Sequence, residues 1–497
     1  MTEPARPSGR THANEPVRPS GAARPDELVY MTATDALAAF ADRTLSPAEL
    51  LTAVAERAEH IEPSVNAFAE RWFDQAMDQA RQAADRYARG TARPLEGLPV
   101  ALKEEQPIAG HPLRDGSMLL RDNVAGETHP IVGRIVAAGG IVHARTTTPE
   151  FCAAGFTHSD LWGVTRNPWS LGHSSGGSSG GSGAALAAGT AMLATGSDIG
   201  GSIRIPAAFN GVVGFKPPYG RVPALPPYNL DHYCHDGPMA RTVADCALLQ
   251  NVIAGHDPRD PVSVPAPAPI PPYTRSLKGR RVAVCVHLGD YPVEPDVVAA
   301  TWDAVSALTE AGAVVEEVEL PWRRADIMRA AWAHYGAIFG PIIAEEMAAH
   351  GDGVTRYVRD FLDRSLKAVA ELGFYGALKI ESQVHADLAR LFERFDALVC
   401  PASGTPAFLA GEDYVETPLV VDGVRLDHNL EAPLTVPFNL ASRCPVLGVP
   451  SGRSSEGVPT GVQVVGRPYD DHTVFEVGAA VTAALPWYAG ESWRPAL

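Results

Sequence analysis

The chain has 497 residues, 45% of them hydrophobic, and a formal net charge of −17 at pH 7. It is long enough to bury a sizeable core in one large or two ordinary domains. Nucleic acids and anionic membranes attract basic surfaces, so this charge argues against both as partners and favours a small neutral substrate. The six cysteines are scattered without a C-x-x-C pair, which predicts reduced thiols, no disulfides and a cytoplasmic location.

The N-terminal region divides into a tail and a helical layer. Residues 1–27 are rich in proline and polar side chains and lack the apolar core of a signal peptide, so we expect a disordered tail. Residues 28–497 then form a single domain. From 33 to 89 the apolar positions recur at helical spacing in three blocks, and Ser46 followed by Pro47 is typical of a helix start. The sequence therefore predicts a helical layer over 28–90.

The rest of the chain alternates between short apolar runs and helical segments. Strands are predicted at 98–103, 139–144, 211–216, 280–286, 314–320, 396–401 and 461–466. Helices are predicted at 239–254, with a cap near Thr242, at 295–311 and over most of 325–395. Seven of the fifteen residues from 258 to 272 are proline, which predicts a surface excursion over 255–275. This alternation predicts an α/β fold, an α/β/α sandwich around a central mixed β-sheet.

The most informative stretch is 176–206, in which two glycine-serine loops flank an apolar segment. Ser178 and Ser202 lie 24 positions apart, each beside glycines that let backbone N–H groups approach a bound atom. An uncharged helix over 184–193 would hold the two loops at a fixed separation. The N–H groups that precede Ser202 are arranged as an oxyanion site requires, and Lys103 ends an apolar strand where burial could make it a base.

These residues resemble the amidase signature family. The resemblance covers nearly the whole chain after the tail and is carried by LSPAEL, GLPVALK, TTTPEF, GVTRNPW, GGSSGGS, GSDIGGSIRIPAAFNGVVGFKP, GPMARTVAD, FNL and GVQVVGRP. It implies a Ser–cis-Ser–Lys triad with Ser202 as nucleophile, Ser178 as bridging serine after a cis Gly177–Ser178 peptide bond, and Lys103 as general base. It further implies that the N–H groups of Ile199, Gly200, Gly201 and Ser202 form the oxyanion hole, and that Asp198 and Arg204 brace the loop.

The triad places a physical requirement on Lys103. A lysine with its ordinary pKa is protonated at neutral pH and cannot accept a proton, so we expect burial to lower the pKa of Lys103. Three features depart from the family pattern. Glu104 replaces the usual aspartate, Ser175 replaces the usual proline, and segment 111–117 replaces a small-polar stretch near the acyl site, so the substrate does not follow from the resemblance.

Two other catalytic interpretations compete. Ser178 and Ser179 each satisfy G-x-S-x-G, the motif of an α/β-hydrolase, but that motif follows an apolar strand and residues 167–174 are typical of a loop. His232, Cys234, His235 and Asp236 have metal-ligand chemistry, but their spacings match no structural zinc pattern and favour a polar loop at the mouth of the site. We expect no metal and no cofactor.

The predicted function is hydrolysis of a small-molecule amide, with carbamates, anilides and esters as further candidates, through an acyl-enzyme on Ser202. A homodimer is left open. The alternative is the glutaminase subunit of a tRNA-dependent amidotransferase, which would use the same triad. Relatives of that kind have a more polar nucleophile loop, whereas Ile199 and Ile205 flank this one. A catalytically inactive binding protein is disfavoured because all three triad positions are filled.

Overall fold

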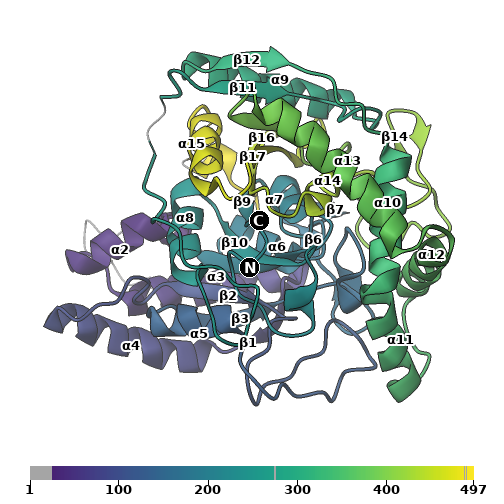
Figure 1. Ribbon diagram of the computed structural model, residues 1–497. Coiled ribbons are helices and arrows are strands. Elements are labelled where there is room, and N and C mark those ends of the chain that lie inside the picture. The colour runs from purple at the N-terminus through teal and green to yellow at the C-terminus, as the bar shows by residue number, and fades with distance from the viewer. Residues whose placement is uncertain (1–24, 274–275, 486, 489) are drawn as a thin grey trace, which may run out of the picture.

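The computed structural model of the protein describes residues 25–273, 276–485, 487–488 and 490–497. Its centre is a mixed sheet of 11 strands in the order β1-β3-β2-β8-β10-β9-β16-β17-β13-β11-β12 (Figure 1). Pairing is parallel among β3, β2 and β8 and among β13, β11 and β12, and antiparallel between the other neighbours. The strands are β1 (Phe68–Arg71), β2 (Pro99–Lys103), β3 (Ile141–Thr146), β8 (Leu193–Asp198), β9 (Val213–Lys216), β10 (His235–Ala240), β11 (Arg281–Val284), β12 (Val314–Glu317), β13 (Ala397–Pro401), β16 (Val446–Arg453) and β17 (Pro459–Gly466).

Helices cover both faces of this sheet. Gly214 and Phe215 are consecutive in β9 and therefore point to opposite faces. A Cβ atom on Gly214 would meet Ile203 and Ala207 at α7, whereas the Phe215 ring packs 4.8 Å from that of Phe475 in α15. One face is covered by α6 (Gly180–Ala188) and α7 (Arg204–Asn210). The other face is covered by four helices that adjoin one another: α5 (Pro130–Ala137), α8 (Val243–Ile253), α9 (Pro295–Glu310) and α15 (Asp471–Thr482). The predicted α/β/α sandwich is confirmed.

The predicted N-terminal helical layer is also present. It consists of α1 (Pro25–Val29), α2 (Ala33–Ala41), α3 (Pro47–Val65) and α4 (Phe73–Arg89), with the short edge strand β1 inserted before α4. Ser46 and Glu49 form a reciprocal capping box at the start of α3, with Pro47 in its first turn. Of the expected tail, residues 1–24 lie outside the described residues and 25–27 belong to α1.

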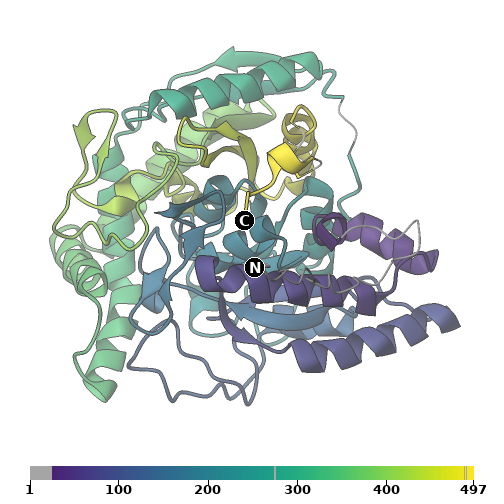
Figure 2. The same ribbon diagram turned by 180° about the vertical axis from the view of Figure 1, so that it is seen from behind.

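The later helices form a separate group at the other side of the molecule, away from the purple N-terminal helices (Figure 1 and Figure 2). They are α10 (Arg324–Ala337), α11 (Phe339–His350), α12 (Arg356–Leu372) and α13 (Phe374–Phe392), which match the helical prediction over 325–395, and the short α14 (Pro437–Leu440) from a later part of the chain. Small two-stranded sheets are formed by β4 (His158–Ser159) with β5 (Gly163–Val164), β6 (Arg166–Asn167) with β7 (Ser170–Ser174), and β14 (Val420–Val421) with β15 (Val424–Arg425). No described helix is both long and apolar enough to cross a membrane.

Two predicted helices begin or end elsewhere. The apolar segment after Ser178 is not one helix to residue 193, because α6 ends at a left-handed Gly189 and the chain continues as strand β8. The helix predicted from residue 239 starts at Val243, capped by Thr242 as expected, and is preceded by strand β10. Gly237 and Pro238 lie inside β10, and both residue types argue against a central strand. The prediction therefore missed this strand.

Candidate active site

Lys103 ends β2 in the middle of the protein and is fully buried. Its side-chain nitrogen Nζ lies 2.7 Å from Ser178 Oγ and 2.8 Å from Ser197 Oγ, and it donates to both hydroxyls. Parallel pairing with β8 brings this strand end beside the loop that carries Ser202. Packing of α6 against β2 brings Lys103 together with Ser178, which is 75 positions away in the sequence.

The Ser178 loop lies directly before α6, and its Gly177–Ser178 peptide bond is cis. Gly177 is required sterically, because a Cβ atom there would lie 2.2 Å from the backbone oxygen of Phe156. The Ser179 N–H donates to the Ser202 carbonyl at 3.1 Å, which joins the two serine loops. Among the described residues no hydrogen bond links the Ser202 hydroxyl to Ser178. The structure therefore brings Lys103 and Ser178 into contact and places Ser202 on the adjoining loop.

Asp198 and Arg204 form a buried ion pair that holds the Ser202 loop. Arg204 Nε donates to Asp198 Oδ2 at 3.0 Å and Nη2 donates to Asp198 Oδ1 at 2.8 Å. The other Arg204 hydrogen bonds reach Thr435 O, Gln463 Oε1 and Asn439 Oδ1. Burial raises the pKa of Asp198, but the Arg204 guanidinium outweighs it and holds this pKa well below its usual range. The bracing positions expected for both residues are thus occupied by a bidentate pair.

The predicted oxyanion-hole amides are not equivalent. The Gly201 N–H donates to Asp198 Oδ1 at 2.8 Å, so it is engaged by the brace, contrary to its expected role. Within the described part of the chain, the N–H groups of Ile199, Gly200 and Ser202 have no acceptor. Tyr335 Oη donates to the Ile199 carbonyl at 3.3 Å, which turns the N–H of the same peptide, that of Gly200, the opposite way.

Two residues beside Lys103 escaped the sequence analysis. Glu105 Oε2 lies 3.3 Å from Lys103 Nζ, and the Cys152 thiol donates to the same oxygen at 2.9 Å. Burial lowers the pKa of Lys103, whereas the Glu105 carboxylate beside it raises this pKa, and the net direction is upward. The expected lowering is therefore wrong for this arrangement. Glu105 gave only a weak signal, a second acidic residue after Lys103, and nothing in the sequence placed Cys152 next to it.

A cavity of about 350 Å³ opens beside the two serine loops. Its lining includes Ser178, Ser197 and Ile199 from the site, and Glu105 and Cys152 next to Lys103. Most other lining residues are apolar, among them Leu113, Phe151, Leu225, Tyr228, Phe339 and Ile343. Leu113 and Asp115 come from segment 111–117, as its expected place near the acyl site requires. No lysine or arginine is found among the described residues of the lining, whereas five lining residues are acidic: Glu105, Asp115, Glu127, Asp198 and Asp236.

The His232–Asp236 region does not assemble as the metal hypothesis required. Cys234, His235 and Asp236 line the cavity, in agreement with the alternative of a polar loop at its mouth, although His235 and Asp236 begin strand β10. The His235 ring lies 2.7 Å from the Tyr233 carbonyl, and Asp236 accepts from Gln106 at 2.7 Å. These side chains are thus already engaged by protein groups.

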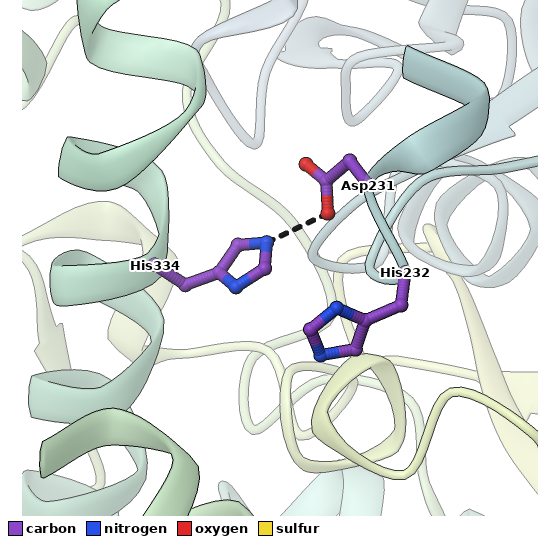
Figure 3. A group of neighbouring side chains, drawn as sticks. All are labelled: Asp231, His232 and His334. Carbon is purple, nitrogen blue, oxygen red and sulfur yellow. Dashed lines mark hydrogen bonds and ion pairs between the residues drawn. The ribbon is translucent and has the colours of Figure 1, made fainter. Parts of the chain in front are cut away.

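His232 instead lies near two other potential ligands, Asp231 and His334 of α10 (Figure 3). Their ligand atoms all lie within 4.8 Å of one another. His334 Nε2 is 2.6 Å from Asp231 Oδ1, whereas two donors about 2.0 Å from a tetrahedral zinc ion lie roughly 3.3 Å apart. The short separation fits a shared proton, and His232 is paired with Glu381 at 3.1 Å. The cluster links α10 and α13 to the segment that precedes strand β10.

Comparison with known proteins decides the family. A family model described as Amidase matches residues 49–475. The chain belongs to this amidase family, the amidase signature enzymes. Amidase signature enzymes are also found among the solved structures that share its fold. A bacterial aryl acylamidase matches with a TM-score of 0.84 and 27% identity, over 93% of this chain and 97% of that one.

Three further relatives have names that describe two different functions. The 6-aminohexanoate cyclic dimer hydrolase matches with a TM-score of 0.81 and 28% identity, over 94% of this chain and 99% of that one. A glutamyl-tRNA(Gln) amidotransferase subunit from Chloroflexus aggregans is 35% identical and covers 93% of this chain and 98% of its own length. The same subunit from Thermotoga maritima matches as a structure with a TM-score of 0.73 and 27% identity, over 93% and 96% of the two chains. The family thus includes both small-molecule amidases and a component of an amidotransferase.

Proposed function

We propose that this amidase signature enzyme hydrolyses a small-molecule amide through an acyl-enzyme on Ser202. The Ser202 oxygen attacks the amide carbonyl, the C–N bond breaks, and water then releases the acyl group. Carbamates, anilides and esters are chemically related substrates of the same site. The observation that carries the proposal is the 2.7 Å contact between buried Lys103 and Ser178, on a loop joined directly to the Ser202 loop.

The proton would travel along this contact. A neutral Lys103 amine accepts the proton of Ser178 as Ser178 accepts that of Ser202, and the reverse transfer protonates the leaving nitrogen. The Ser202 hydroxyl is free to turn toward Ser178, and catalytic hydrogen bonds often tighten only once substrate is bound. The N–H groups of Ile199, Gly200 and Ser202 would receive the developing oxyanion.

The test of the nucleophile is covalent labelling. A fluorophosphonate should label the wild-type enzyme once per chain, and Ser202→Ala should abolish both labelling and amide turnover. The substitution removes one hydroxyl from a residue that is 8% exposed, and this hydroxyl makes no hydrogen bond with described residues, so the protein should stay folded. Ser179→Ala is a matched control on the neighbouring loop, because it alters G-x-S-x-G without touching the proposed triad. Labelling that persists in Ser202→Ala would place the nucleophile elsewhere.

A second candidate is the glutaminase subunit of an amidotransferase, favoured by the 35% identity to the Chloroflexus protein. Glutamine carries a carboxylate that a binding site normally meets with a cation, and the described cavity lining has no lysine or arginine. This difference in charge favours the independent hydrolase. The deciding measurement compares ammonia release from glutamine with release from uncharged amides of similar size, by the protein purified alone. Selective glutamine turnover that depends on a co-purifying partner protein would support the amidotransferase.

A further inference from the structure

Glu105 contacts the proposed base in a way that the triad does not explain. It follows β2 by two residues, and its Oε2 lies 3.3 Å from Lys103 Nζ while accepting the Cys152 thiol at 2.9 Å. Its second oxygen, Oε1, is buried and has no hydrogen-bond partner among the described residues. The side chain is 21% exposed and lines the cavity. The Glu105 carboxylate therefore lies between the cavity and the Lys103 amine.

The other titratable groups around Lys103 are less able to compensate its charge. Burial raises the pKa of the Cys152 thiol far above neutrality, so this thiol is uncharged at neutral pH. Burial also raises the pKa of Asp115 well above its usual value, which disfavours its charged form. Asp236 is engaged by Gln106 at 2.7 Å and by His129 at 3.4 Å. Within the described part of the chain, Glu105 makes the one ion pair of Lys103.

We propose that Glu105 is a positioning residue that keeps Lys103 protonated in the substrate-free site and sets the pH above which the amine can act as a base. The inference rests on the role proposed for Lys103 above. An ammonium beside a carboxylate loses its proton only at higher pH, because deprotonation leaves the carboxylate charge uncompensated in a poorly solvated place. Each proton released to solvent leaves one neutral amine, which the relay through Ser178 requires.

The experiment measures the rate of Ser202 labelling by a neutral fluorophosphonate between pH 6 and 10. This reaction needs the base but no leaving amine, so it reports the protonation state of Lys103 directly. In the wild type the rate should rise about tenfold per pH unit across most of this range. In Glu105→Gln the rise should occur at least one unit lower, so that the rate at pH 7 increases about tenfold or more and a plateau is reached.

Two further variants separate charge from structure. Glu59→Gln makes the same change at an exposed position of α3, outside the cavity lining, and should leave the profile unchanged. Glu105→Asp retains a carboxylate and should stay close to the wild type even if the Gln variant folds poorly. A Glu105→Gln profile with the wild-type midpoint, or equal shifts in the Asp and Gln variants, would overturn the proposal. Labelling that survives Ser202→Ala would instead refute the proposed function, so the two failures are distinguishable.

Discussion

At the scale of single residues, the chemistry depends on how Lys103 divides its contacts. The Ser178 hydroxyl at 2.7 Å offers a path for a proton, whereas the Glu105 carboxylate at 3.3 Å stabilises the charged amine. The contact with Ser178 favours catalysis, whereas the contact with Glu105 keeps the amine protonated at low pH and so prevents it from acting as a base. A lysine in this position can serve as a base only where the free energy of the neutral form is close to that of the ammonium.

The relay through Ser178 predicts a difference between leaving groups. An amine leaves only after it gains a proton, whereas a nitrophenolate leaves without one. Lys103→Ala and Ser178→Ala should therefore lower kcat/KM for an amide at least about tenfold more than for a nitrophenyl ester with the same acyl group, a difference of about 1.4 kcal/mol in transition-state stabilisation. Ser306→Ala, at an exposed position of α9, is the control. Equal losses on both substrates would remove the proton-return role.

At this scale, the sequence indicated candidate residues where a motif limits the local geometry. Ser178 and Ser202 lie in glycine-rich loops, and Asp198 directly precedes the second of them. The residue types of these loops already limit what the backbone can do. Glu105, Cys152 and Tyr335 escaped the sequence analysis, because their places depend on long-range packing. Cys152 reaches Glu105 across 47 positions, and Tyr335 comes from α10 to a carbonyl 136 positions away. Local packing also directs the Gly201 N–H to the Asp198 carboxylate, so this group does not point into the predicted oxyanion hole.

At the scale of elements, Arg204 connects four parts of the structure. It stands at the start of α7 and reaches Asp198 at the end of β8, Asn439 in α14 and Gln463 in β17, as well as the carbonyl of Thr435. A planar guanidinium can donate in these several directions at once, whereas an ammonium is a single point. The position of the Ser202 loop is therefore tied to three secondary-structure elements through one side chain.

Arg204→Lys should therefore destabilise the fold and misplace the Ser202 loop. Loss of part of a buried ion-pair network typically costs about 3–5 kcal/mol, because acceptors remain buried without donors. The urea midpoint should fall accordingly, and fluorophosphonate labelling should slow more than the midpoint shift alone explains. Arg329→Lys, at an exposed position of α10, is the matched control and should change neither quantity. Wild-type labelling in Arg204→Lys would show that the brace does not position the nucleophile.

Elements could be predicted from the sequence where residue type and environment agree. The apolar strands β2, β11, β13 and β17 and the capped helices α3 and α8 were all expected near their observed positions. Strand β10 was not, since its Gly and Pro residues oppose a central strand, and only pairing with β8 and β9 on its two sides imposes it. Strand β8 was also missed in the prediction, because its small residues are equally suited to a buried helix.

At the scale of the whole molecule, buried neutral histidines lie in parts of the fold far apart in the sequence. His143 belongs to β3, and its Nε2 lies 2.9 Å from the Thr190 carbonyl. A carbonyl can only accept, so this nitrogen carries the proton and donates it. His428 Nδ1 accepts the Leu430 N–H at 3.1 Å, which requires that nitrogen to be unprotonated. Burial lowers the pKa of His143 to about 4 and, together with Arg364, that of His428 to about 3.

These two groups predict how stability changes with pH. In the unfolded chain each histidine titrates near about 6.5, so below that pH the unfolded state binds a proton that the folded state excludes. The contribution is complete above about pH 6.5 and is lost as the pH falls toward the folded values. Between pH 7 and pH 5, each histidine should therefore lower the free energy of unfolding by about 2 kcal/mol.

His428→Asn tests this expectation, because an asparagine oxygen can still accept from the Leu430 N–H but does not titrate. The variant should be less stable than the wild type at pH 7, where it loses the ring contact with Trp332. Between pH 7 and pH 5, however, its urea midpoint should fall less than that of the wild type, by the equivalent of about 2 kcal/mol. His60→Asn, at an exposed position of α3, should run parallel to the wild type. The expectation is wrong if His428→Asn loses as much stability on acidification as the wild type. The His428 ring is then already protonated in the folded protein, with the Asp360 carboxylate 3.7 Å from Nε2 as its partner. The acid sensitivity must in that case come from other groups.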